Sequence, residues 1–371
     1  MRVALYNLTT TTQFGGVESF VWSVARCLAA RGVETTIVGG RGTIRQNDPN
    51  VRVVEFPFLS RERMRRVPGL ATAYTLTKLI ERLSFGANAL AFMRREHFDI
   101  VHIQKPYDLP PAVLLKSPGA SKIIFGCHGT DFFPGDRFFA PRADASVSCS
   151  AFNAEQIRAH YGFTPRVIYN GIDPQLFKPQ PRADELRHSL AGDGALIFYA
   201  GRLVRWKGVQ YLIRALAKLS ARRDATLVIA GAGEFRTTLE QLARELDLST
   251  RVRFVGYVPA PDLPRYYAAS DIVTVASYAN ETFSISSLEA MACERPVVGS
   301  NFGGIPEVVA DGESGLLARP EDADDFADKF EELLEDAALR ERMGRAGRQR
   351  ACDTFTWEQV TERAVAVYNS I

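Results

Sequence analysis

The chain has 371 residues, of which 46% are hydrophobic and 24% are charged, and its formal net charge is +2. This length is sufficient for two hydrophobic cores, and the composition is that of a soluble globular protein. No apolar stretch approaches the roughly 18 residues of a membrane span, and residues 1–7 have the pattern of a strand, which excludes a signal peptide.

The positive charge is concentrated in the first half of the chain. Residues 1–175 contain 21 Lys and Arg against 14 Asp and Glu, whereas the remainder contains 24 against 29. A basic first half predicts an anionic partner or an anionic membrane surface, and ordinary surface variation is the alternative. The five cysteines are scattered and lack CxxC spacing, which favours a reduced cytoplasmic protein over a metal or redox site.

Short apolar runs alternate with helical patterns along the first half, and this alternation predicts a parallel α/β sheet. Helices are expected at residues 17–30, at 65–95 with breaks near Pro68 and Gly86, and at 153–160. The expected strands are 2–6, 35–38, 51–55, 100–103, 122–126, 145–148 and 166–169.

A second series of strands follows, with helices between them. These strands are expected at residues 195–200, 226–230, 251–255, 272–276, 296–299 and 315–317. Residues 173–193 contain three prolines and no periodicity, so they are interpreted as the linker between domains at 1–175 and 176–354. Two Rossmann-like halves place ligands where the carboxyl ends of both sheets face a shared cleft.

Glu281 and Glu289 bracket a segment in which a strand ends, the chain turns and a helix begins. The N-terminus of a helix presents free N–H groups and partial positive charge, which suits a phosphate. A carboxylate accepts hydrogen bonds from vicinal hydroxyl groups, such as those of a sugar or ribose. These features together predict a site for a sugar joined to a nucleoside diphosphate.

Arg202 and Lys207 lie on the loop that follows the first strand of the second half. Two cations directed at one point stabilise a diphosphate as it leaves with additional negative charge. The alternative is that both are solvated surface cations; Arg205 and Trp206 between them are interpreted as loop residues.

Three further segments occupy positions next to strand or helix ends. Phe14-Gly15-Gly16 precedes the first helix, where glycines let backbone N–H groups approach a ligand or simply form a turn. His128-Gly-Thr-Asp131 follows the strand at 122–126, and Gly256-Tyr257 ends the strand at 251–255.

The segment Glu281–Glu289, with Gly303-Gly-Ile-Pro-Glu307 after it, resembles the E-x7-E signature of the retaining glycosyltransferases of family 4. The similarity extends over essentially the whole chain. Ser284 stands where the family usually has Gly, and Glu294 stands where a Gly often precedes the next strand. The resemblance implies an α/β GT-B fold, in which two Rossmann-like doubly wound domains face a cleft and the last helix, 355–371, packs back on the first domain. Trp357 is then a packing anchor.

The resemblance also implies a role for each candidate residue. Glu281, His128, Arg202 and Lys207 form the catalytic group, with Glu281 and His128 on the donor sugar and the two cations on the leaving diphosphate. The remaining donor contacts are Glu289 on the ribose, the amides of Phe283, Ser284, Ile285 and Ser286 on the phosphate and sugar ring, Gly15 and Gly16 on the phosphate, and Gly256 and Tyr257 on the base. Asp131 is a candidate acceptor contact.

The implied reaction is a metal-independent transfer with retained anomeric configuration, in which the leaving phosphate takes the proton of the acceptor hydroxyl. Family frequency ranks UDP first and GDP next as the carrier, and it points to glycan, glycolipid or polysaccharide biosynthesis. No cofactor, metal or nucleic acid is expected, and Asp322-Ala-Asp324 is interpreted as a helix cap.

The acceptor is expected on the first half, which carries the basic run Arg61–Arg66. These arginines face either anionic lipid headgroups, on the inner face of a membrane, or an anionic acceptor; a solvated charged surface is the alternative. Three other functions are weighed: a GT-B nucleotide-sugar epimerase, a silent nucleotide-sugar-binding subunit, and an NAD-linked oxidoreductase. The missing GxGxxG after the first strand argues against the last.

Overall fold

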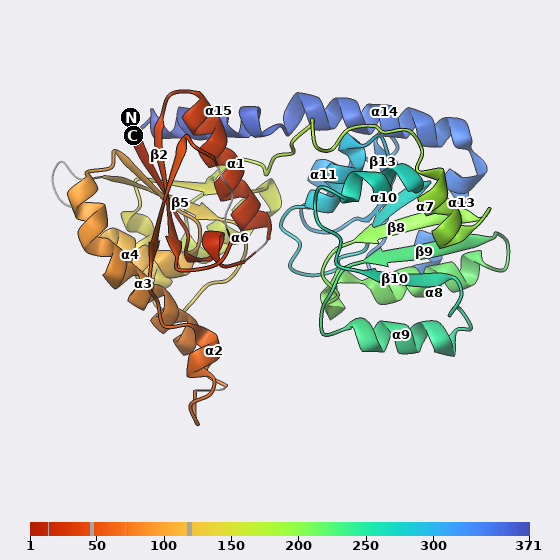
Figure 1. The fold of residues 1–371 in the computed structure, drawn as a ribbon, viewed down its shortest axis with the longest axis horizontal. Helices are drawn as coiled ribbons and strands as arrows, with labels where there is room; N and C mark the ends of the chain where they lie inside the picture. The colour runs from red at the N-terminus through yellow and green to blue at the C-terminus, as the bar shows by residue number, and fades with distance from the viewer. Residues whose placement is uncertain (14, 45–47, 71, 117–120) are drawn as a thin grey trace. The chain divides into compact units, whose positions relative to one another are not determined.

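The computed structural model describes residues 1–371 except 14, 45–47, 71 and 117–120. The chain forms two compact units: unit 1 comprises Met1–Asn170 with Trp357–Ile371, and unit 2 comprises Gly171–Thr356. The division therefore falls at residue 170, where 175 was expected from the sequence. Each unit contains one parallel sheet (Figure 1), which confirms the predicted α/β class. None of the described helices combines the length and the hydropathy needed to span a membrane.

The sheet of unit 1 has seven strands in the order β3-β2-β1-β4-β5-β6-β7. The strand order reverses between β1 and β4, and ligands of such sheets bind at the carboxyl ends near this point. Its strands are β1 (Arg2–Tyr6), β2 (Glu34–Gly40), β3 (Val51–Phe56), β4 (Ile100–Ile103), β5 (Lys122–Cys127), β6 (Ala145–Ser148) and β7 (Arg166–Val167).

Helices cover both faces of this sheet, and each face has its own hydrophobic cluster. Phe20 of α1 and Trp357 of α15 belong to one cluster, with ring centroids 6.1 Å apart, so the end of the chain packs on its beginning. Phe85 of α3 belongs to the other cluster. The helices of unit 1 are α1 (Gly16–Ala30), α2 (Arg61–Met64), α3 (Tyr74–Glu96), α4 (Leu109–Val113), α5 (Asp136–Phe139), α6 (Ala151–Tyr161) and α15 (Trp357–Tyr368).

The helix predicted over residues 65–95 is wrong at its start and at its second break. The chain forms the short α2 before this span, and α3 begins only at Tyr74; Ala71 lies outside the described residues. Helix α3 continues through Gly86 without interruption. A Cβ atom at Gly86 would lie 2.3 Å from Cβ of Pro111, so this glycine serves the close approach of α4.

The sheet of unit 2 has six strands in the order β10-β9-β8-β11-β12-β13, with its reversal between β8 and β11. All of them are parallel, as expected. The strands are β8 (Ala195–Ala200), β9 (Ala225–Ala230), β10 (Val252–Gly256), β11 (Ile272–Val275), β12 (Val297–Ser300) and β13 (Gly315–Ala318). The helices are α7 (Asp184–Ala191), α8 (Val209–Leu219), α9 (Arg236–Glu245), α10 (Leu263–Ala269), α11 (Ile285–Ala292), α12 (Ile305–Val308), α13 (Ala323–Glu335) and α14 (Ala337–Thr354).

Helix α7 lies inside the segment 173–193, which was interpreted as the linker between the domains. Its Arg187 is buried and forms an ion pair with Asp271 at 2.8 Å, and it also donates to the carbonyl oxygens of Ala269 and Gly194. These bonds attach α7 to the segments that precede β8 and β11. This helix was not predicted from the sequence because three prolines precede it and its apolar pattern extends over few residues.

Glu294 adopts a left-handed backbone conformation immediately after α11. Its φ is +56°, a value that a residue with a side chain rarely adopts and that glycine adopts without strain. The carbonyl oxygen of Glu294 also lies where a Cβ atom at Gly344 of α14 would approach it to 2.3 Å, so the backbone here is tightly confined. A glycine, which the resemblance implies at this position, would adopt this conformation without strain.

Replacing Glu294 by Gly is expected to stabilise unit 2 by about 1 kcal/mol, because the left-handed conformation then carries no Cβ strain. The free energy of unfolding in urea measures the change. Glu313→Gly is the matched control, since Glu313 is exposed and does not have a positive φ. An E294G variant that is destabilised as much as E313G would contradict this account.

Candidate functional site

The candidate donor residues of unit 2 lie on two loops that follow neighbouring central strands. β8 and β11 pair in parallel, so the loop after β8, with Arg202 and Lys207, and the turn after β11, with Glu281, leave the same edge of the sheet. The backbone N–H of Tyr278 donates to the carbonyl oxygen of Trp206 at 3.0 Å and joins the two segments. The strand pairing thus brings together residues about 75 positions apart in the chain.

Lys207 and Glu281 form an ion pair with 2.5 Å between Nζ and Oε2. The two side chains are 19% and 9% exposed, so the pair is largely shielded from water. The hydroxyl of Ser277 donates to the same carboxylate oxygen at 2.5 Å. A charge-assisted pair in a partly buried position holds both side chains in one geometry. Ser277 was not among the residues predicted from the sequence, although its position two residues after β11 marks it as a strand-end residue.

Arg202 and Lys207 both lie against the indole ring of Trp206. The Arg202 guanidinium carbon is 5.5 Å and the Lys207 Nζ is 4.9 Å from the ring centroid. These distances are within the range of cation–π attraction. Trp206, interpreted from the sequence as a loop residue, therefore orients both cations.

Tyr199, at the end of β8, lies beneath this loop. Its hydroxyl donates to the carbonyl oxygen of Arg202 at 3.1 Å. Burial raises the pKa of Tyr199, the Glu281 carboxylate raises it further, and the Arg202 guanidinium lowers it. Arg202 and Glu281 therefore act electrostatically on the same phenol.

Glycines allow the backbones around Glu281 to approach each other. A Cβ atom at Gly208 would lie 1.9 Å from the carbonyl oxygen of Ala276, and one at Gly303 would lie 2.1 Å from that of Glu281. Gly208 and Gly303 also have φ values of +73° and +63°, which favour glycine. The N–H of Gly304 donates to the carbonyl oxygen of Glu281 at 3.0 Å. The Gly303-Gly304 part of the motif thus supports the turn that carries Glu281.

Helix α11 begins one residue after Ser284, which is its N-cap. The Ser284 hydroxyl accepts a hydrogen bond from the Ser287 N–H and lies 2.6 Å from the Ser287 hydroxyl. The φ of Ser284 is −95°, which any residue adopts, so serine in place of the usual glycine requires no backbone strain. The amides of Ile285 and Ser286 occupy the first helical turn, where N–H groups lack intrahelical acceptors.

Glu289 lies on α11 and is partly exposed. The hydroxyl of Tyr267 on α10 donates to its Oε2 at 2.8 Å. Burial raises the pKa of Glu289 to about 7, and the hydrogen bond from Tyr267 opposes this shift. The two glutamates of the motif therefore differ, because Glu281 has a cationic partner and Glu289 has a phenol.

The remaining candidates of unit 2, Gly256 and Tyr257, lie at the end of β10. Tyr257 is 65% exposed, and Gly256 has a φ of +79°. The carbonyl oxygen of Gly256 accepts a hydrogen bond from the N–H of Gly231 at 2.7 Å. A Cβ atom at Gly231 would lie 1.9 Å from the carbonyl oxygen of Gly201, so Gly231 permits tight packing against the loop that carries Arg202. Asp322 caps α13, as predicted, by accepting from the N–H groups of Asp324 and Asp325.

In unit 1, Gly15 and Gly16 form the start of α1, and Phe14 lies outside the described residues. His128 follows β5, and its Nε2 lies 2.9 Å from Oε1 of Gln104. Burial, together with the nearby Lys105 ammonium, lowers the pKa of His128 to about 4, so the imidazole is neutral at pH 7.

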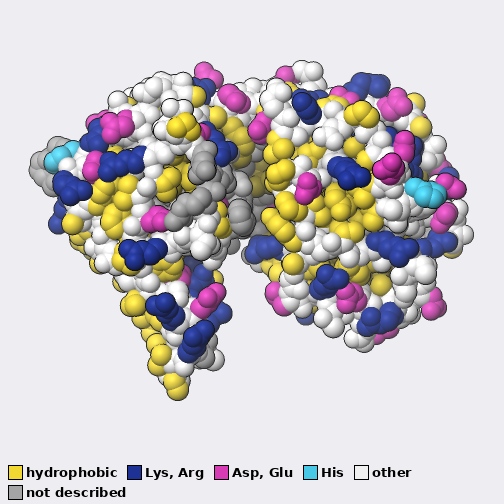
Figure 2. All heavy atoms as spheres, viewed as in Figure 1, with side chains coloured by type: hydrophobic (Ala, Val, Ile, Leu, Met, Phe, Trp, Pro, Cys, Tyr) yellow, Lys and Arg dark blue, Asp and Glu magenta, His cyan; other side chains and the backbone are white. Residues whose placement is uncertain are grey.

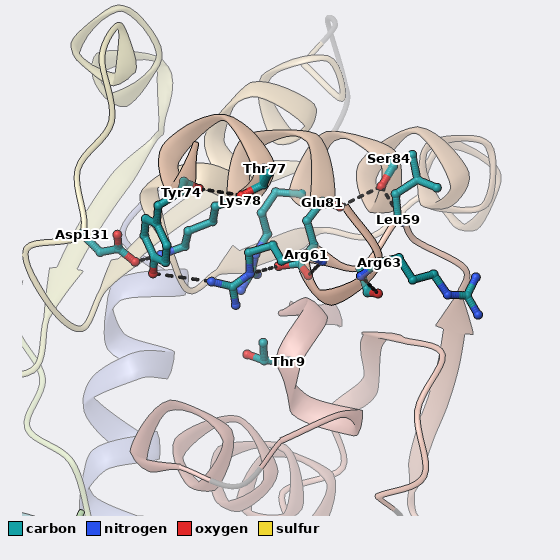
Figure 3. A network of polar contacts seen from close by, with 12 residues as sticks. Thr9, Leu59, Arg61, Arg63, Tyr74, Thr77, Lys78, Glu81, Ser84 and Asp131 are labelled. Carbon is teal, nitrogen blue, oxygen red and sulfur yellow. Dashed lines mark hydrogen bonds and ion pairs between the residues drawn. The ribbon is translucent and has the colours of Figure 1, made fainter. Parts of the chain in front are cut away.

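Asp131 is 45% exposed and forms an ion pair with Lys78 of α3, whose side chain is only 5% exposed. Burial lowers the pKa of Lys78 to about 7, and the neighbouring cations Lys105, Arg82 and Arg61 contribute. Figure 3 shows this pair in line with a second one, in which Arg61 Nε lies 2.8 Å from Glu81 Oε2. The polar residues of α3 therefore face a common polar region of unit 1.

A cavity of about 380 Å³ lies beside this region, at the carboxyl ends of β1, β2 and β3. Its lining is predominantly polar and contains three arginines, Arg41, Arg61 and Arg65, with the carboxylates Glu62 and Glu81. Glu81 was not among the residues predicted from the sequence, although the spacing of the polar residues Lys78, Glu81 and Arg82 among apolar ones indicates a polar face on this helix.

Two parallel-sheet units, the second with charged groups at the carboxyl ends of its central strands, define a GT-B glycosyltransferase architecture. Two family models match the chain: "Glycosyltransferase Family 4" covers residues 14–176, and "Glycosyl transferases group 1" covers residues 182–350.

Among its relatives, the D-inositol 3-phosphate glycosyltransferase of Corynebacterium glutamicum (strain R) is 30% identical over 414 residues, which cover 100% of this chain and 96% of that protein. The MMP α-(1→4)-mannosyltransferase of Mycolicibacterium hassiacum is 28% identical over 412 residues, covering 99% and 98%. The chain belongs to glycosyltransferase family 4 and is a transferase enzyme, as the resemblance implied.

A solved structure has the same fold. Anabaena HepE in complex with UDP superimposes with a TM-score of 0.82 at 20% sequence identity, covering 100% of both chains. This likeness confirms the GT-B fold predicted from the sequence.

Replacing Glu289 by Gln is expected to remove a pH-dependent part of the stability of unit 2. The folded chain holds a proton on Glu289 up to a pKa of about 7, whereas an unfolded glutamate loses it near a pKa of about 4.3. The folded state therefore binds more protons between these values, and its stability falls as the pH rises. Between pH 5 and pH 8 the unaltered chain should lose about 2 kcal/mol more than E289Q in urea unfolding. Equal losses would contradict the raised pKa.

Proposed function

We propose that this enzyme transfers a sugar from a nucleoside-diphosphate sugar to an acceptor hydroxyl, with UDP as the first candidate carrier and GDP as the second. The observation that carries the proposal is the Lys207–Glu281 pair at the carboxyl ends of β8 and β11. Lys207 is a cation that can bind a diphosphate, and Glu281 is a carboxylate that can bind sugar hydroxyls. The two side chains are in direct contact with each other. HepE, which shares the fold, binds UDP and UDP-glucose.

In this proposal Glu281 holds hydroxyls of the donor sugar and Glu289 accepts the ribose hydroxyls. Oε2 of Glu289 accepts a hydrogen bond from the Tyr267 hydroxyl. Oε1 is therefore the oxygen that would contact the ligand. The amides from Phe283 to Ser286, which lead into α11 and begin its first turn, bind the phosphate and line the sugar ring. Gly256 and Tyr257 meet the base, and Gly15 and Gly16 meet the phosphate.

The leaving diphosphate is stabilised by Arg202 and Lys207. Trp206 holds both cations in position before the diphosphate gains charge, so little reorganisation is needed as the bond breaks. The leaving phosphate oxygen takes the proton of the acceptor hydroxyl, which attacks from the same face and retains the anomeric configuration. His128, neutral at pH 7, donates or accepts a hydrogen bond at the transferred sugar.

The acceptor is proposed to bind to unit 1, in the cavity lined by Arg41, Arg61 and Arg65. Arginines suit an acceptor that carries a phosphate, because a guanidinium binds phosphate oxygens in a bidentate manner. The relative from Corynebacterium glutamicum is named for D-inositol 3-phosphate, a phosphorylated polyol. Asp131 is a second candidate contact for the acceptor, with Lys78 as its partner.

The reaction is proposed to need no metal ion, because Arg202 and Lys207 supply the positive charge. The Asp322 carboxylate, the nearest sequence match to a metal-binding DxD loop, is engaged as a helix cap.

A panel of UDP-, GDP- and ADP-sugars, with and without D-inositol 3-phosphate and other hydroxyl acceptors, tests the function. We expect nucleotide release that depends on an acceptor, a product with the anomeric configuration of the donor, and unchanged rates in excess EDTA. Activity that disappears in EDTA and returns with manganese would overturn metal independence. Epimerised donor with no nucleotide release would identify an epimerase, and binding without turnover would identify a silent subunit.

Lys207→Met and Glu281→Gln should each lower kcat by about 100-fold or more, since each removes a group that contacts the reacting donor. The double variant should lose little beyond the single ones, because the two residues act as a unit. Arg205→Ala is the matched control: Arg205 is exposed on the same loop, and its loss should change kcat less than about twofold. If R205A is as impaired as K207M, the assignment is wrong.

A further inference from the structure

The first half of helix α3 directs three charged side chains toward the interior of unit 1. Lys78, Glu81 and Arg82 are 4%, 5% and 1% exposed, respectively. Each has an ionic partner from another segment, and Figure 3 shows Lys78 and Glu81 with theirs. A surface helix of a globular protein ordinarily buries its apolar face instead. These charges can lie in the interior because the region that they border is itself polar.

The first half of the same helix carries an apolar stripe on its outward face. Leu76 and Leu83, two helical turns apart, are 49% and 40% exposed, and Leu79 and Ile80 between them are partly exposed. Positions spaced by three, four and seven residues form one continuous stripe on a helix. Exposure of this apolar stripe to water is unfavourable in free energy. Contact with another apolar environment would therefore stabilise it.

The segment before α3 also carries exposed apolar side chains. Leu59 and Val67 are 55% and 49% exposed. Of the ten exposed large hydrophobic side chains in the described part of the chain, five lie between residues 59 and 83. Figure 2 shows hydrophobic and basic side chains side by side over the projecting part of unit 1 that carries α2 in Figure 1. Such clusters mark interaction surfaces.

Arginines flank this apolar cluster. Arg63, Arg65 and Arg66 are exposed, and within the part of the chain that the structure describes no ion pair neutralises them. Glu62 is the only acidic residue between positions 59 and 80. The surface therefore combines exposed aliphatic groups with uncompensated positive charge. Its electrostatic complement is an extended anionic surface with an apolar interior.

We propose that the α2–α3 surface, formed by Leu59, Arg63, Arg66, Val67, Leu76 and Leu83, docks on an anionic lipid membrane. The aliphatic side chains enter the boundary between headgroups and acyl chains, and the arginines contact the anionic headgroups. A purely electrostatic site would not need exposed leucines, and a purely apolar interface would not gather arginines.

Docking would also bring the cavity of unit 1 close to lipid headgroups. Ser60, Arg61 and Glu62 line the cavity and belong to the same segment as the docking surface. An acceptor carried on a lipid could then reach the cavity without leaving the membrane. This last step rests on the proposed function, whereas the docking itself does not.

Co-sedimentation of the full chain with vesicles tests the proposal. We expect binding to phosphatidylcholine vesicles that contain phosphatidylglycerol, little binding to phosphatidylcholine alone, and weaker binding as salt rises from about 0.1 M to about 0.5 M. The affinity of R63E/R66E for these vesicles should be lower by about tenfold or more. L76Q/L83Q should bind less at every salt concentration, because it removes the apolar contribution.

Two controls keep the test specific. R244E/R342E makes the same change in net charge at exposed positions of unit 2, and L114Q alters an exposed leucine of unit 1 outside the surface. Both should bind vesicles as the unaltered chain does.

The proposal is overturned if the unaltered chain does not bind anionic vesicles, or if the controls lose as much binding as R63E/R66E and L76Q/L83Q. It is also overturned if L76Q/L83Q converts a dimer to a monomer without affecting vesicle binding, because the surface would then join two copies. Vesicle binding requires no donor sugar, so its outcome is independent of the proposed transfer reaction.

Discussion

The ion pair between Lys207 and Glu281 is the interaction on which the site of unit 2 depends. Two opposite charges lie in a partly buried position, where an unpaired charge would be strongly unfavourable. The hydroxyl of Ser277 completes the bonding of the same carboxylate oxygen. The pair can form only because Gly208 and Gly303 let the surrounding backbones approach to distances that any side chain would prevent. The electrostatics of the site thus depend on the shape of its glycine-rich turns.

The two glutamates of one short motif have different chemical environments. Glu281 is joined to a cation, whereas Glu289 receives one hydrogen bond from a phenol, and burial raises the pKa of Glu289 to about 7. Two carboxylates of the same type can therefore serve different parts of a ligand, because their surroundings differ. In the proposed function Glu281 contacts the reacting sugar and Glu289 contacts the ribose, away from the bond that breaks.

The interior face of α3 is polar in its first half, whereas Phe85 and Phe92 farther along the helix are buried in the hydrophobic cluster. The buried Arg82 lies 3.2 Å from the carboxylate of Asp108, and Lys78 and Glu81 have partners of their own. Because these pairs satisfy the charges, the helix can present its leucines outward without leaving buried charges unpaired. A cavity lined by polar groups and an exposed apolar stripe are therefore two consequences of one helix orientation. This arrangement connects the proposed acceptor site to the proposed membrane contact.

The sequence by itself determined the class of fold and the positions of the candidate residues. Strands and their order of appearance were predictable because apolar runs and helical periodicity are local, and the cap at Asp322 was predictable because a cap involves neighbouring residues. The Glu281–Glu289 segment indicated the family because it resembles a known signature that lies within nine consecutive residues. Only the tertiary structure decided that Lys207 bonds Glu281, that α3 passes Gly86 unbroken, that Glu294 has a positive φ, and that the leucines of α3 face outward. Each of these features depends on which distant segment lies opposite a residue, and periodicity along one chain cannot specify that neighbour.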